Sequence, residues 1–111
     1  MKRALILACA IALLPAVSGA DVVRVPDDVA SIPMALFLAS SYDTILVAPG
    51  TYSVNLEWPD KDGLKLLSEE GPAATILDGG HNVQVIGIYV KVDTTTVVRG
   101  FTIQNGHAEG Q

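Results

Sequence analysis

The chain has 111 residues, of which twelve are acidic and seven basic, so its formal net charge is −5. Nucleic acids and anionic lipid surfaces bind clustered Lys and Arg, so this balance excludes nucleic acid as an expected partner and argues against docking on acidic lipid. A chain of this size supports one domain at most.

Residues 1–20 have the composition of an export signal. Lys2 and Arg3 give a positive start, Ala4 to Val17 form an apolar stretch, and small residues end at Ala20. The apolar stretch is shorter than the roughly 20 residues that span a bilayer, which disfavours a membrane anchor. We therefore predict a mature chain that starts at Asp21, is exported (secreted, cell-surface or periplasmic), and has no stable membrane insertion once the signal is removed.

Cysteine usage agrees with a fold that is stable by packing alone. The single cysteine of the chain, Cys9, lies within the predicted signal. The mature chain can therefore form no intramolecular disulfide, thiol nucleophile or cysteine metal cluster.

After residue 21 the pattern predicts a short strand and then a helix. Val22 to Val25 is a β-branched run stopped by Pro26. Ser31 is a suitable N-cap, and Pro33 is tolerated in a first helical turn. Four apolar residues then recur at i, i+3, i+4 and i+7, which indicates one buried helical face: Ile32, Ala35, Leu36 and Ala39.

The remainder of the chain consists of strand and turn signals. Pro49-Gly50 predicts a turn with a positive φ at the glycine. A bend is expected at Gly87 and a kink at Gly100. The predicted extended segments are residues 44–48, 52–58, 64–68, 74–77, 83–92, 97–98 and 101–103.

One phrase recurs. Thr75-Ile76-Leu77-Asp78-Gly79 is echoed 27 positions later by Thr102-Ile103-Gln104-Asn105-Gly106, and Thr44 opens a similar run 31 positions before Thr75. A short strand followed by an abrupt turn at a recurring interval is typical of a solenoid, whose coils stack in parallel around a common interior.

These motifs resemble the N-terminal part of right-handed parallel β-helix proteins of the pectin-lyase-like superfamily. The likeness rests on residues 23–32, on Asp43 to Tyr52, and on the two later phrases at 71–80 and 98–106. The resemblance implies an all-β fold of solenoid coils with an N-terminal capping helix. It also implies that chemistry, in the enzymes of this superfamily, uses clustered carboxylates on the outer face of middle coils, often with calcium and an Arg or Lys.

The expected organisation follows from this resemblance. Residues 1–20 are the signal, 21–42 the entry strand and capping helix, and 43–111 the first coils, incomplete at the C-terminal end. Asp78 and Asn105 each precede glycine and suit corners with left-handed backbone. Because family members have many more coils, we expect further coils or a partner chain beyond Gln111.

Few side chains suggest chemistry. Asp60-Lys61-Asp62-Gly63 resembles the start of a calcium loop, but no carboxylates follow at the required spacing, so an ordinary turn is the preferred interpretation. Glu69 and Glu70 are interpreted as solvated loop charges, and Asp78 as a corner residue in preference to a catalyst.

The other candidates are single residues. Arg99 could be a lyase-like base but has no carboxylate partner in the sequence, and His81 and His107 share no metal-ligand spacing. Trp58 with Tyr52 could stack on a sugar ring, although packing is the preferred interpretation. The sequence therefore predicts no catalytic, cofactor-binding or metal-binding residue, and no cofactor.

The functional hypothesis is an exported, non-catalytic β-helix scaffold whose partner could be polysaccharide. The alternative is the N-terminal, non-catalytic portion of a polysaccharide-degrading lyase, hydrolase or esterase whose catalytic coils lie beyond Gln111. Fold alone does not decide between them, and whether the protein is an enzyme is left open.

Overall fold

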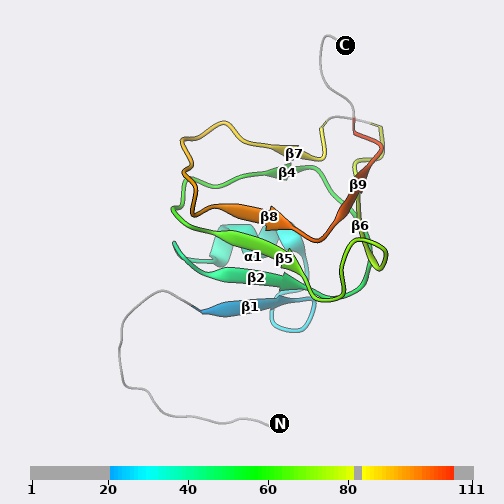
Figure 1. Ribbon diagram of the computed structural model, residues 1–111, viewed down its shortest axis with the longest axis horizontal. Coiled ribbons are helices and arrows are strands. Elements are labelled where there is room, and N and C mark those ends of the chain that lie inside the picture. The colour runs from blue at the N-terminus through cyan, green and yellow to red at the C-terminus, as the bar shows by residue number, and fades with distance from the viewer. Residues whose placement is uncertain (1–20, 82–83, 107–111) are drawn as a thin grey trace, which may run out of the picture.

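The computed structural model describes residues 21–81 and 84–106, so the predicted signal 1–20 and His107 lie outside the described residues. The described part is mostly β (Figure 1). Its elements are β1 (Val22–Val25), α1 (Ile32–Leu38), β2 (Thr44–Val47), β3 (Gly50–Ser53), β4 (Leu56–Glu57), β5 (Lys65–Ser68), β6 (Thr75–Asp78), β7 (Ile86–Gly87), β8 (Val97–Arg99) and β9 (Thr102–Gln104).

The strands form three parallel sheets. Their orders are β1-β2-β5-β8, β3-β6-β9 and β4-β7. The chain passes from one sheet to the next and returns to the first sheet one position further along, so that β2, β3 and β4 make one coil and β5, β6 and β7 the next (Figure 1). The protein is therefore a parallel β-solenoid of about three turns, as the repeated phrase predicts.

The interior is filled by residues that alternate along each short strand. Ile45 and Val47 of β2 are completely buried, while Thr44 and Leu46 between them are partly exposed. Pairing in register places Leu66 of β5 beside Ile45, so equivalent apolar side chains stack from coil to coil. This stacking explains how short strands with one buried face form a continuous core without hairpins.

Helix α1 forms where the sequence predicts it. The side chain of Ser31 accepts a hydrogen bond from the backbone N–H of Met34 (3.3 Å), and proline occupies the first turn. All four residues of the predicted apolar face are buried: Ile32, Ala35, Leu36 and Ala39. The helix contacts β1, β2 and β4, all of which belong to the first part of the solenoid.

The repeat interval differs from the one that the sequence suggests. Thr102 pairs with Ile76, not with Thr75, so the two phrases are offset by 26 positions in the sheet. Ile103 consequently lies beside the inward-facing Leu77. The earlier run at Thr44 belongs to another sheet and pairs with Lys65.

Two predicted strands are shorter than expected. The segment 52–58 is divided into β3 and β4, because the chain bends between Ser53 and Leu56 to enter the third sheet. Of the predicted 83–92 stretch, the structure shows only Ile86–Gly87 as strand, and residues 82–83 lie outside the described part. The third sheet is the smallest of the three in the described part, where it consists of the two short strands β4 and β7.

The predicted corners are confirmed at three positions and wrong at one. Gly50, Gly100 and Asn105 have positive φ angles of 151°, 91° and 56°. Asp78 does not, because it is the last residue of β6, and the left-handed backbone falls instead on Gly80 and His81.

Candidate functional site

A groove lies on the outer side of the third sheet, next to α1. It consists of two hollows of about 310 and 300 Å³, which meet because Asn55 and Glu57 line both. The lining residues are Pro33, Leu36, Phe37, Asn55, Leu56, Glu57, Pro59, Gln84, Gly87 and Tyr89. We call this surface the α1–β7 groove.

The alternation of strand β4 places polar groups in the groove. Leu56 is buried in the core, so its neighbours Asn55 and Glu57 are exposed on the opposite face. In register, Glu57 pairs with Gly87 of β7. The residue beside Glu57 therefore has no side chain of its own, which leaves space above its backbone.

Tyr89 occupies the space that Gly87 leaves. A Cβ at position 87 would lie only 2.7 Å from Cε2 of the Tyr89 ring, so the ring packs directly on the glycine. The side-chain amide of Gln84 donates a hydrogen bond to the Tyr89 hydroxyl. The ring is held at one face and at its polar tip, yet the residue remains 69% exposed.

Helix α1 supplies the other wall. Phe37 lies off the buried helical face and is 75% exposed, and Pro33 and Pro59 line the same hollow. The Lys61 ammonium group fixes this end of the helix by donating to the backbone carbonyls of Leu36 (2.9 Å), Phe37 (2.6 Å) and Ala39. The turn at Asp60–Gly63 thus places the Lys61 ammonium group at the helix C-terminus, where a positive charge is favourable. This structural role is compatible with the interpretation of the segment as an ordinary turn.

The groove combines apolar rings with hydrogen-bonding groups and carries no positive side chain among its lining residues. Both protons of the Asn55 amide are engaged, with the carbonyls of Gly79 (3.2 Å) and Gln84 (3.3 Å). Asn55 therefore offers its oxygen as an acceptor, and Glu57 offers two more acceptor atoms. Such a surface suits a neutral ligand that has both hydroxyl groups and C–H faces.

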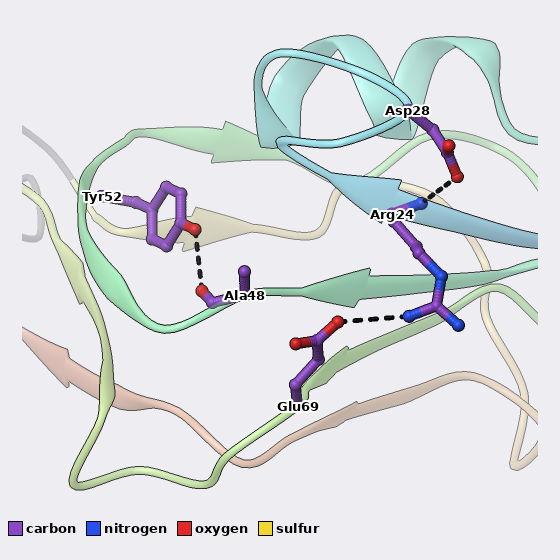
Figure 2. Close-up of polar contacts among 5 residues, drawn as sticks. All are labelled: Arg24, Asp28, Ala48, Tyr52 and Glu69. Carbon is purple, nitrogen blue, oxygen red and sulfur yellow. Dashed lines mark hydrogen bonds and ion pairs between the residues drawn. The ribbon is translucent and has the colours of Figure 1, made fainter. Parts of the chain in front are cut away.

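The aromatic pair considered from the sequence lies elsewhere. Trp58 is buried in the core, which agrees with packing and leaves no face for a ligand. The Tyr52 hydroxyl donates to the carbonyl of Ala48 (2.7 Å; Figure 2). Burial, followed by the nearby charges of Glu69 and Asp27, raises the pKa of Tyr52.

Glu69 is exposed in the bend that follows β5, as expected of a solvated loop charge, and it also forms an ion pair. Its carboxylate pairs with the Arg24 guanidinium at 3.2 Å, which connects the end of β5 to β1 across β2 (Figure 2). The backbone N–H of Arg24 donates to Asp28 in the loop that follows β1 (2.9 Å). These contacts join coils and loops, and the neighbouring Glu70 is likewise exposed in the loop.

Asp78 is a structural residue of the solenoid corner. It accepts hydrogen bonds from the side chains of Gln104 (3.1 Å) and Asn105 (3.0 Å) and from the Gly80 N–H (2.8 Å). These bonds, the one from Gln104 first, lower the pKa of Asp78 below its ordinary value of 3.8. The carboxylate therefore joins β6 to the coil of β9.

The remaining candidates do not assemble into a site. Arg99 and His81 are exposed, and Arg99 lies in β8 in register with Leu67. Within residues 21–81 and 84–106 no three His, Cys, Asp or Glu side chains are grouped so that they could hold a metal ion.

The groove residues were not identified from the sequence. Phe37 carried a usable signal, because it is a large aromatic residue off the apolar face of a helix whose buried positions were already assigned. Tyr89 carries none, since its placement depends on the missing side chain at Gly87, and a glycine in a sequence indicates only a possible bend.

Comparison of the chain with family models, curated proteins and solved structures finds no match. The one helix of the described residues spans seven positions, and none there is long and apolar enough to cross a membrane.

Proposed function

We propose that this protein is an exported β-solenoid scaffold that binds neutral polysaccharide in the α1–β7 groove. The observation that carries the proposal is the pair of exposed rings, Phe37 and Tyr89, on either side of the polar group formed by Asn55 and Glu57. Sugar rings present C–H faces that pack on aromatic rings, and their hydroxyl groups donate to carboxylate and amide oxygens.

The charge of the groove favours a neutral chain over an acidic one. Glu57 is the one carboxylate among the described lining residues, and it would repel the carboxylates of a uronic acid polymer. The net charge of −5 acts in the same direction. We therefore expect neutral oligosaccharides to bind better than polygalacturonate.

The proposal is for binding without catalysis. Glycoside hydrolysis uses two carboxyl groups about 5–9.5 Å apart. Among the described residues that line the groove, Glu57 is the single carboxylate. The groove is accordingly proposed as a binding surface, and this holds equally for the alternative in which catalytic coils lie beyond Gln111.

We also propose three points about the architecture. The first is that the chain is a member of the pectin-lyase-like superfamily, and the second is that α1 covers the N-terminal end of its solenoid. The third is that further coils or a partner chain pair with β8 and β9. The parallel topology supports the first point, and the contacts of α1 with β1, β2 and β4 support the second. The third rests on β8 and β9, each of which has a strand neighbour on one side only within the described residues.

Binding is tested by titrating the isotopically labelled protein with neutral hexasaccharides of β-1,4-glucan and β-1,4-xylan, and with oligogalacturonate, and recording amide chemical shifts. We expect shifts concentrated at Phe37, Asn55, Glu57 and Tyr89 with a neutral chain. Tyr89→Ala and Phe37→Ala should each weaken binding by about tenfold, equivalent to about 1.4 kcal/mol.

Matched controls separate the groove from general apolar exposure. Met34→Ala is the control for Phe37→Ala, because Met34 is an exposed residue of the same helix outside the groove lining. Val92→Ala is the control for Tyr89→Ala, because Val92 is an exposed apolar residue three positions after Tyr89 and also outside the lining. Both should bind as the wild type does, whereas Gly87→Ala should bind as weakly as Tyr89→Ala because the added Cβ displaces the ring. Unchanged affinity in both aromatic variants would contradict the proposal.

A further inference from the structure

The carboxylate of Asp43 is buried at the start of the second coil. The residue is 5% exposed and directly precedes β2. One of its oxygens accepts a hydrogen bond from the backbone N–H of Ser40 (2.8 Å), and the other from the backbone nitrogen of Asp21 (2.9 Å). Both donors are uncharged peptide groups in the chain as it stands.

A buried carboxylate is costly unless a cation or several strong hydrogen bonds compensate its charge. Within residues 21–81 and 84–106 the one ion pair joins Arg24 to Glu69. Asp43 therefore has main-chain partners but no cationic side chain beside it in this part of the chain.

The sheet itself fixes the position of the Asp21 nitrogen. The Thr44 N–H donates to the Asp21 carbonyl (2.8 Å), and the next residue, Val22, pairs in register with Thr44. The nitrogen stays next to Asp43 because β1 pairs with β2, so this placement does not depend on residues before position 21.

We propose that removal of the export signal turns this hydrogen bond into an ammonium–carboxylate ion pair that stabilises the mature fold. This rests on the proposed export and on processing after Ala20. Hydrolysis of the peptide bond between Ala20 and Asp21 by an export peptidase consumes one water. It leaves a carboxylate on Ala20 and an amino group on Asp21, which takes up a proton to become an ammonium group.

The consequence is a protein whose stability depends on its processing. Hydrogen bonds between two charged groups are shorter and stronger than those of neutral donors, and the burial of the Asp43 carboxylate reduces screening on its side of the pair, while Asp21 is exposed. The new terminus supplies a cation, which Asp43 lacks among residues 21–81 and 84–106. The processed chain should therefore be more stable than the same chain with a neutral nitrogen at this position.

The test compares mature protein carrying a free amino group at Asp21 with the same protein acetylated there. Acetylation keeps one N–H at the same atom but removes the charge, and the acetyl group takes the place that the Ala20 carbonyl occupies in the precursor. The free-amine form is expected to melt roughly 4–8 °C higher, and the full-length precursor to match the acetylated form. Equal melting temperatures would overturn the proposal.

Asp43→Asn supplies the second half of a double-mutant cycle. In that background the difference in melting temperature between free and acetylated termini should vanish, and a persisting difference would overturn the proposal.

If the variant does not fold, the rate at which a soluble reagent acetylates the wild-type Asp21 amine tests the ion pair instead. A paired ammonium should react roughly tenfold more slowly in the folded protein than in urea, whereas equal rates contradict pairing.

N-terminal sequencing of the exported protein tests the processing position directly. A mature start at Asp21 supports the proposal, and a start elsewhere overturns it. None of these measurements involves a glycan, so their failure is distinguishable from a failure of the groove to bind polysaccharide.

Discussion

The coil of β5 and β6 and the coil of β8 and β9 have similar side chains in equivalent positions but bury them to different extents. Leu77 of β6 is fully buried, while Ile103 of β9, its partner in register, is 52% exposed. In the first sheet Leu66 is fully buried and Val98 beside it only partly. Burial in a solenoid therefore depends on the coil that stacks on each residue, because an apolar residue in the outermost coil has a neighbour on one side only.

Truncation of the core at the two levels gives the largest expected contrast. Leu66→Ala should lower the free energy of unfolding by about 2–5 kcal/mol, because it leaves a cavity in the packed interior. Ile103→Ala should cost less than about 1 kcal/mol, since its side chain is already half in water. Urea unfolding followed by circular dichroism measures both.

Equal losses for the two variants would mean that Ile103 is covered in solution, as pairing with a further coil or a partner would cause. If Leu66→Ala does not fold, the pair Leu66→Val and Ile103→Val provides the same comparison with a smaller loss in the free energy of unfolding.

The link between α1 and the following turn is the next largest effect. Lys61→Met keeps much of the apolar stem but removes the ammonium group that binds three carbonyls at the end of the helix. We expect a loss of about 1–2 kcal/mol in unfolding free energy. Lys91→Met, at an exposed position, is the matched control and should change stability little. A similar loss in both variants would show that the effect is one of net charge.

The smallest effect concerns the attachment of the last coil through Asp78, and it depends on pH. Hydrogen bonds lower the pKa of the Asp78 carboxyl in the folded protein below its unfolded value of 3.8. Its contribution to the free energy of unfolding is therefore fully present above pH 3.8 and is lost as pH falls through the lower folded-state pKa. Wild type should exceed Asp78→Asn in stability at neutral pH, and the difference should narrow below pH about 4.

Asp93 is the natural comparison for this measurement. The pKa of Asp93 is also lowered, by hydrogen bonds from Thr95, but these lie within its own loop and join no coils. Asp93→Asn should leave the amide protection of β9 unchanged, whereas Asp78→Asn should reduce it. A difference between wild type and Asp78→Asn that is constant from neutral to acidic pH would contradict the assignment.

The sequence predicted the parts of the structure that depend on local chemistry. The helix was placed by Ser31, Pro33 and the spacing of its apolar residues, and the kinks by Gly100 and Asn105. The solenoid itself followed from the repeated phrase, although the structural interval is 26 and not 27. The one-residue difference arises because the two phrases share a Thr-Ile pair, whereas the sheet aligns Thr102 with Ile76 and Ile103 with the inward-facing Leu77.

The candidate groove was not predictable in the same way. Its walls come from α1 and from residues near β7, more than 40 positions apart, and their proximity depends on how the third sheet packs. The contacts of Lys61 and the pairing of Glu69 with Arg24 likewise connect segments that carry no shared local pattern.

The unequal lengths of the coils have an evolutionary consequence. From Lys65 to its partner Val97 the chain takes 32 positions, while from Thr44 to Lys65 it takes 21, yet both pairs lie in register in one sheet. The difference of 11 positions lies in all three connections between strands: residues 69–74 and 79–85 are four and five positions longer than 48–49 and 54–55, and residues 88–96, which lead from β7 to β8, are two positions longer than 58–64. Insertions and deletions at this connection can accumulate without altering strand pairing, so a lineage can remodel the surface beside Tyr89 while the core it inherits stays the same.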